Sequence, residues 1–209
     1  MDMRSFNYAV IVLLLAVAGC NSNRQPDYFP FEAGVRKFMR VSTRTISDSD
    51  TTETTEVRLA SVMLGERELP QLGKVWIVET PRDSGPSSYS YFRKTKEAVL
   101  QFVPRREGPP AEMVFLSLPL ENGKFWYESE AKRQRLEVVG QETVETEAGE
   151  FPDCYKVAVI RRDADWAMHQ WFAPGVGPVK WESRSVWEKD GVKHEQYRSA
   201  ELVRHGTTE

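Results

Sequence analysis

The feature that most constrains this chain is an alternation of apolar and polar residues that begins near Tyr28 and continues almost to the C-terminus. Side chains two positions apart lie on the same face of a strand, so this period is typical of half-buried β-strands. Glycine and proline interrupt the alternation as turns require. The pattern predicts a mainly β fold, a curved antiparallel sheet or half-barrel meander of about ten to eleven strands. The segments that fit it are residues 35–46, 57–63, 75–78, 89–93, 98–103, 113–118, 136–144, 153–160, 166–172, 179–187 and 192–203.

Helix is expected to be a minor component. The best helical candidate, residues 128–136, is short and charged, and the sequence shows no sustained apolar stripe at helical spacing. We therefore predict one β domain over residues 28–205, followed by a polar tail at residues 206–209. A chain of this length fits a single domain with a sizeable core.

The N-terminus predicts a cell-envelope address. An apolar run from Tyr8 to Ala18 leads into Gly19-Cys20, and it is about half as long as the ~20 residues that a membrane-spanning helix needs. It fits the apolar region of a signal peptide. The small residues before Cys20 resemble a bacterial lipobox. That resemblance implies removal of residues 1–19, acylation of Cys20 with palmitate-type chains, and a flexible tether over residues 20–27.

The residue after Cys20 and the net charge indicate where the domain is located and which partners it lacks. Asn21 stands where aspartate would signal inner-membrane retention in Gram-negative bacteria, so the resemblance implies an outer-membrane anchor with the domain facing the periplasm. The net charge is −3, and there is no basic face to suggest nucleic acid. After acylation of Cys20, Cys154 is the one cysteine left, so no intramolecular disulfide is expected.

The sequence offers no convincing catalytic or metal-binding set. Its three histidines, His169, His194 and His205, do not have the spacing of a metal site, and no Gly-x-Ser-x-Gly motif accompanies them. Cys154 alternates as a buried strand residue would. The Gly-rich segment Phe172 to Lys180 predicts a tight hairpin rather than a phosphate loop, because it precedes a strand and lacks the Lys-Ser/Thr ending. We expect no enzyme activity, no cofactor and no metal.

Three motifs occur in order along the chain: Pro119-Leu120-x-x-Gly123-x-x-Trp126, then Ala148-Gly149-x-Phe151-x-x-Cys154-x-x-Val157, then Trp171-Phe172-Ala173-Pro174-Gly175-Val176-Gly177-Pro178-Val179-Lys180. Together they resemble a group of bacterial lipoproteins and secreted proteins whose chemistry is uncharacterised. The resemblance implies a half-barrel loosely similar to the lipoprotein-localisation carriers. An internal echo, residues 29–34 against residues 118–123, indicates either two similar turns or an ancient duplication.

Two functions remain open. The sequence favours a non-enzymatic binding or assembly module that is anchored to the membrane and holds an envelope protein through its strand edges or concave face. The alternative is a carrier or chaperone that binds a lipid or lipoprotein acyl chain, or another apolar ligand, in the concave face of the half-barrel. In that case the expected groove residues are Trp126, Trp166, Trp171 and Phe172.

Overall fold

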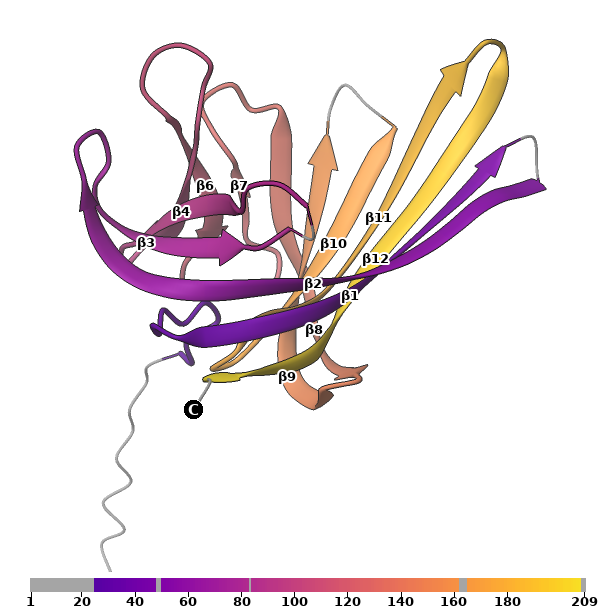
Figure 1. Cartoon of the computed structure of the whole chain (residues 1–209). Helices are drawn as coiled ribbons and strands as arrows, with labels where there is room; N and C mark the ends of the chain where they lie inside the picture. The colour runs from indigo at the N-terminus through magenta and orange to yellow at the C-terminus, as the bar shows by residue number, and fades with distance from the viewer. Residues whose placement is uncertain (1–24, 48–49, 83, 162–164, 208–209) are drawn as a thin grey trace, which may run out of the picture.

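The computed structural model describes residues 25–47, 50–82, 84–161 and 165–207 and shows one antiparallel β domain (Figure 1). The predicted signal peptide and Cys20 lie outside the described residues. Within the described residues there is no helix, and none that could span a membrane. The twelve strands are β1 (Val35–Ser47), β2 (Asp50–Leu69), β3 (Gly73–Thr80), β4 (Ser88–Lys94), β5 (Ala98–Val103), β6 (Ala111–Ser117), β7 (Phe125–Tyr127), β8 (Gln134–Thr146), β9 (Gly149–Arg161), β10 (Trp166–Ala173), β11 (Gly177–Lys189) and β12 (Val192–Thr207).

The predicted fold class is confirmed, with one more strand than the ten to eleven expected. The additional strand is β7, whose three residues are too few to show an alternation. The helical candidate at residues 128–136 forms a turn and the first residues of β8 instead. At the other end β12 continues through Thr207, paired with Val35 of β1, so residues 206 and 207 of the predicted tail belong to the sheet.

All twelve strands form one curved sheet in the order β6-β5-β4-β3-β2-β1-β12-β11-β10-β9-β8-β7. Its two ends approach each other, because Val114 N of β6 donates to Glu128 O just after β7, at 2.7 Å. The Trp126 indole of β7 also donates to Val114 O, at 3.2 Å. The sheet is therefore a nearly closed, barrel-like sheet whose two ends meet at β6 and β7.

The chain halves repeat the same construction. Strands β1 to β6 form one six-stranded meander and β7 to β12 form another, and β1 pairs with β12 at the join. Gly34 precedes the first meander and donates to Met63 O of β2, while Gly123 precedes the second and donates to Val138 O of β8, both at 2.8 Å. Both glycines have positive φ, 84° and 81°, which side chains with a Cβ rarely adopt. The duplication hypothesis predicts this equivalence.

The main core is built by side chains from strands β4 to β10 and from the segment before β1. Phe172 is completely buried there, and the N-terminal segment adds Tyr28 and Phe29. Burial of large apolar side chains is the chief stabilising contribution in a domain without disulfides. The remaining buried members are Phe92, Val99, Leu116, Leu120, Trp126, Leu136, Val138, Val157 and Val159.

The segment before β1 is part of this domain. The Gln25 side-chain amide exchanges two hydrogen bonds with the backbone of Leu120, at 2.5 and 2.9 Å. Asp27 O accepts from Gly175 N at 2.7 Å, and its carboxylate pairs with Lys94. Residues 25–27, which the sequence assigns to the tether, therefore contact the β domain directly.

Candidate functional site

The four predicted groove residues do not come together around an open groove. Trp126 and Phe172 belong to the main core, and Trp166 packs against it while partly exposed. Trp171 lies in a second buried cluster with Cys154 and Val179, and its ring has Lys156 and Lys180 over it. These side chains pack in the hydrophobic core, where large aromatic residues of a curved sheet are most often found.

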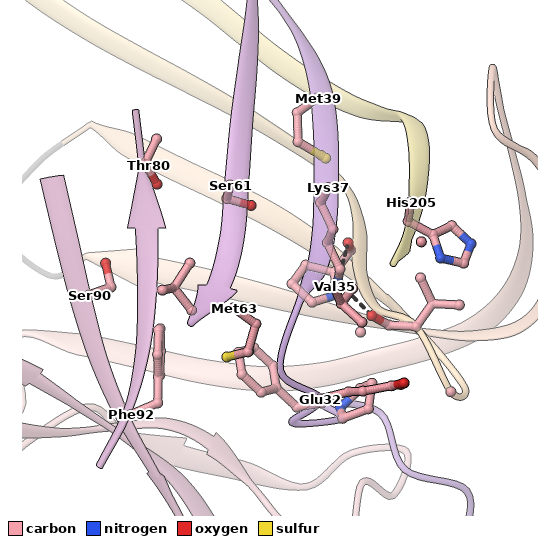
Figure 2. A pocket seen from close by; sticks show the side chains of 18 of the residues that line it. Glu32, Val35, Lys37, Met39, Ser61, Met63, Thr80, Ser90, Phe92 and His205 are labelled. Carbon is pink, nitrogen blue, oxygen red and sulfur yellow. Dashed lines mark hydrogen bonds between the residues drawn. The ribbon is translucent and has the colours of Figure 1, made fainter. Parts of the chain in front are cut away.

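An open cavity of about 630 Å³ lies elsewhere in the concave side, chiefly against the first strands of the sheet (Figure 2). Its volume falls within the ~300–1,000 Å³ typical of small-molecule sites. Successive inward-facing positions line it: β1 contributes Val35, Lys37 and Met39, and β2 contributes Ser61 and Met63. Further apolar lining comes from Phe29, Val78, Phe92, Phe115 and Trp181.

Lys37 is the cation of this cavity. Although the residue as a whole is only partly buried, its ammonium group is withdrawn from water. The Nζ atom donates to Val176 O at 2.5 Å and to Pro178 O at 3.4 Å. Within the described residues no ion pair joins it to a carboxylate. Burial alone lowers the pKa of Lys37 from 10.5 to about 8, because a low-dielectric surrounding disfavours the charged form.

Two other titratable groups face the same space. His205 of β12 lies directly opposite Lys37 in the sheet register. The pKa of His205 is lowered, first by burial and then by the charge of Lys37. Glu32 lies at the exposed rim, in the segment before β1 (Figure 2). An ammonium has three donor hydrogens, so Lys37 retains one donor beyond its two carbonyl acceptors, and the site is suited to an anionic or carbonyl head group.

The predicted hairpin at residues 172–180 is confirmed and closes one side of the cavity. It joins β10 to β11, and Gly177 within it has a φ of +87°. A Cβ at this position would lie 3.2 Å from Lys37 Nζ and 3.5 Å from Pro30 Cδ. The positive φ therefore favours glycine at this position, and an added Cβ would require the end of the Lys37 side chain to shift by a few tenths of an ångström.

Cys154 is fully buried, as the alternation predicted. Its Sγ donates to Phe151 O at 3.3 Å, and burial raises the pKa of the thiol to about 11. A thiol of this kind is unreactive at neutral pH. Across the described part of the chain, no group of histidine, cysteine, aspartate and glutamate side chains is arranged to hold a metal ion.

No protein family model and no curated protein matches this sequence, so membership of the lipoprotein group stays a prediction. Three solved structures are similar. An exported protein with a YmcC-like fold from Bacteroides fragilis has 17% identity and a TM-score of 0.47, over 88% of this chain and 100% of that one. A lipoprotein from Parabacteroides distasonis has 13% identity and a TM-score of 0.48, over 87% and 99%.

The third similar structure is a LolA superfamily protein from Nitrosomonas europaea, with 11% identity and a TM-score of 0.26, over 87% of this chain and 88% of that one. With TM-scores below 0.5, the likenesses are distant. They assign no ligand and no activity to this chain.

Proposed function

We propose that this protein is a non-enzymatic lipoprotein of the cell envelope that binds one acyl chain in the cavity beside Lys37. The observation behind the proposal is the cavity itself, about 630 Å³, whose aromatic, methionine and valine side chains alternate with polar ones such as Ser61, Thr80 and Ser90. An apolar chain would displace water from these surfaces, and each buried CH₂ contributes ~0.8 kcal/mol.

The single cation supports a ligand with a polar end. Lys37 has given up much of its hydration and has only carbonyl acceptors among the described residues. A carboxylate or ester oxygen in the cavity would accept its remaining hydrogen bond and, if charged, would offset the cost of burying the ammonium. Of the two functions left open by the sequence, the cavity therefore favours the acyl-chain carrier.

The anchor would keep this cavity near the bilayer. Gln25 is fixed to Leu120, and it follows Cys20 by five positions. Five positions of fully extended chain span at most ~18 Å. A domain with Cys20 acylated would thus lie close to the membrane surface, which is also where free acyl chains are found. We infer the outer membrane of a Gram-negative cell, with the domain facing the periplasm.

A chain-length titration tests the proposal. Saturated fatty acids from eight to sixteen carbons are titrated calorimetrically into the full chain. The detergent that keeps the protein in solution is used at a concentration too low to compete with the fatty acid for the cavity. We expect one site per protein and a dissociation constant that falls about fourfold per added CH₂ until the cavity is full. The alcohols of the same length should bind more weakly, because they lack the charge that Lys37 recognises.

A matched pair of variants controls for surface binding. Ser90 of β4 lines the cavity, whereas its neighbour Tyr89 points to the opposite face. Ser90→Trp should fill the cavity and abolish binding, and Tyr89→Trp should leave it unchanged. Equal binding by both variants, or no dependence on chain length, would refute the proposed function.

A further inference from the structure

The edge of β2 is unpaired over more than half of its length. β2 pairs with β1 from Asp50 to Val62, but β3 joins its other side only from Val62 onward. Along residues 50–61 the described chain places no strand on that side. In Figure 1 the β1–β2 hairpin projects beyond the rest of the sheet, beside the β11–β12 hairpin.

This edge has little of the protection that sheet edges usually carry. Residues 54–59 are all exposed, and Val57 and Leu59 are 51% and 42% exposed. The run contains no proline, and its register with β1 is regular from Glu53 to Val62. A long, regular edge with exposed apolar side chains is a template for another strand. The order of its charges then decides which strand can pair with it.

We propose that the partner is a second copy of this chain, paired antiparallel through β2 about a two-fold axis at Val57. In an antiparallel pair, the backbone N–H and C=O groups of two opposed residues either both face the partner strand or both point away from it. Along one strand these two kinds of residue alternate. In a symmetric pair of identical strands the two-fold axis must therefore pass through a residue, not between two residues. An axis at Glu56 sets two carboxylates opposite each other, and an axis at Arg58 sets two guanidinium groups opposite each other. An axis at Val57 sets each Glu56 opposite Arg58 of the second copy.

The surroundings of Arg58 support this register. Across the sheet Arg58 lies opposite Arg40 of β1, and directly opposed like charges destabilise a strand pair. Arg40 has two carboxylate partners, Glu147 at 2.8 Å and Glu201. Within the described residues no ion pair joins Arg58 to a carboxylate, and the second copy would supply one. The other face of the pair would bring together Val57 of both copies, flanked by Leu59 against Thr55.

Charge exchange tests the register, with sedimentation velocity of the full chain in detergent micelles as the readout. Glu56→Arg and Arg58→Glu each create two like-charge pairs and should raise the dimer dissociation constant by ~10-fold or more. The double variant E56R/R58E restores opposite charges and should restore the dimer. A monomeric wild type, or single variants that dimerise as well as the wild type, would overturn the proposal.

A cysteine on the axis gives an independent measurement. Val57→Cys places two thiols within the Cβ separation of a cross-strand pair, so mild oxidation should link two copies. Thr55→Cys, which lies off the axis, should not link, and Cys154 is buried in both variants. Cross-linking of Val57→Cys to a different protein, or equal linking by both cysteines, would refute self-pairing. These outcomes do not depend on the cavity, because fatty-acid binding is measured separately.

Discussion

Replacing Lys37 by methionine should change how stability depends on pH. The pKa of Lys37 falls from 10.5 in the unfolded chain to about 8 in the folded one. Below pH 8 the lysine is charged in both states, and the folded state bears the full cost of burying the cation. Between pH 8 and 10.5 the unfolded chain still holds a proton that the folded chain has released, so the free energy of unfolding rises with pH. Above 10.5 the cost is gone.

The size of the effect follows from the same two pKa values. At about 1.4 kcal/mol per pKa unit, the full change is about 3.5 kcal/mol, and about 2.5 kcal/mol of it is reached by pH 10. Lys37→Met lacks the titrating group, while every other group is shared by the two proteins. The stability of the wild type relative to Lys37→Met should therefore increase by about 2.5 kcal/mol from pH 7.5 to pH 10.

Urea unfolding followed by tryptophan fluorescence measures this difference at each pH. His205 titrates below the chosen window, because its pKa is lowered from 6.5 by burial and by Lys37. Lys96→Met, at an exposed position of the loop between β4 and β5, controls for the loss of one positive charge. If the difference in stability between wild type and Lys37→Met stays constant from pH 7.5 to pH 10, the Lys37 ammonium is solvated. That result would contradict its burial in the cavity.

Three further outcomes are expected. Fatty-acid affinity should be constant from about pH 7 to pH 8, where the ligand is a carboxylate and Lys37 is charged, and should decline above pH 8 as Lys37 loses its proton. The affinity for the matched alcohol should not decline, and calorimetry at several pH values compares the two. Cys154 should resist iodoacetamide at pH 8 in the folded protein and react fully in urea, because its pKa is raised to about 11; rapid labelling of the folded protein would contradict its burial. Phe172→Ala should lower the free energy of unfolding, measured by urea denaturation, by ~3–5 kcal/mol. Val139→Ala, at an exposed site, should change it by less than ~0.5 kcal/mol. Equal losses in the two variants would show that the core lies elsewhere.

Much of the fold could be predicted because half-buried strands leave a period-two pattern. The alternation of Val35, Lys37 and Met39 places all three on one face, and in the structure they line one wall. The hairpin at residues 172–180 was predictable from its glycines and proline, which have few conformational solutions. Strand β7 was not, because three residues are too short for a period to appear.

The site was harder to predict than the fold. Aromatic size suggested a groove at Trp126, Trp166, Trp171 and Phe172, but the same property makes such side chains good core residues, and the structure uses them to fill space. The cavity forms instead where smaller or flexible residues such as Ser61, Met63 and Ser90 face inward. Period-two alternation shows which residues share a face. It does not show how far the curved sheet stands from the segment that covers it.

Photo-crosslinking with a fatty acid that carries a diazirine at its methyl end tests the central claim most directly. The full chain is irradiated with the bound probe, and mass spectrometry maps the modified residues. We predict one label per protein on cavity-lining side chains such as Met39, Met63 and Trp181, and loss of that label in Ser90→Trp. Labels confined to exposed apolar residues such as Phe125 and Ile160 would contradict an acyl-chain site in the cavity.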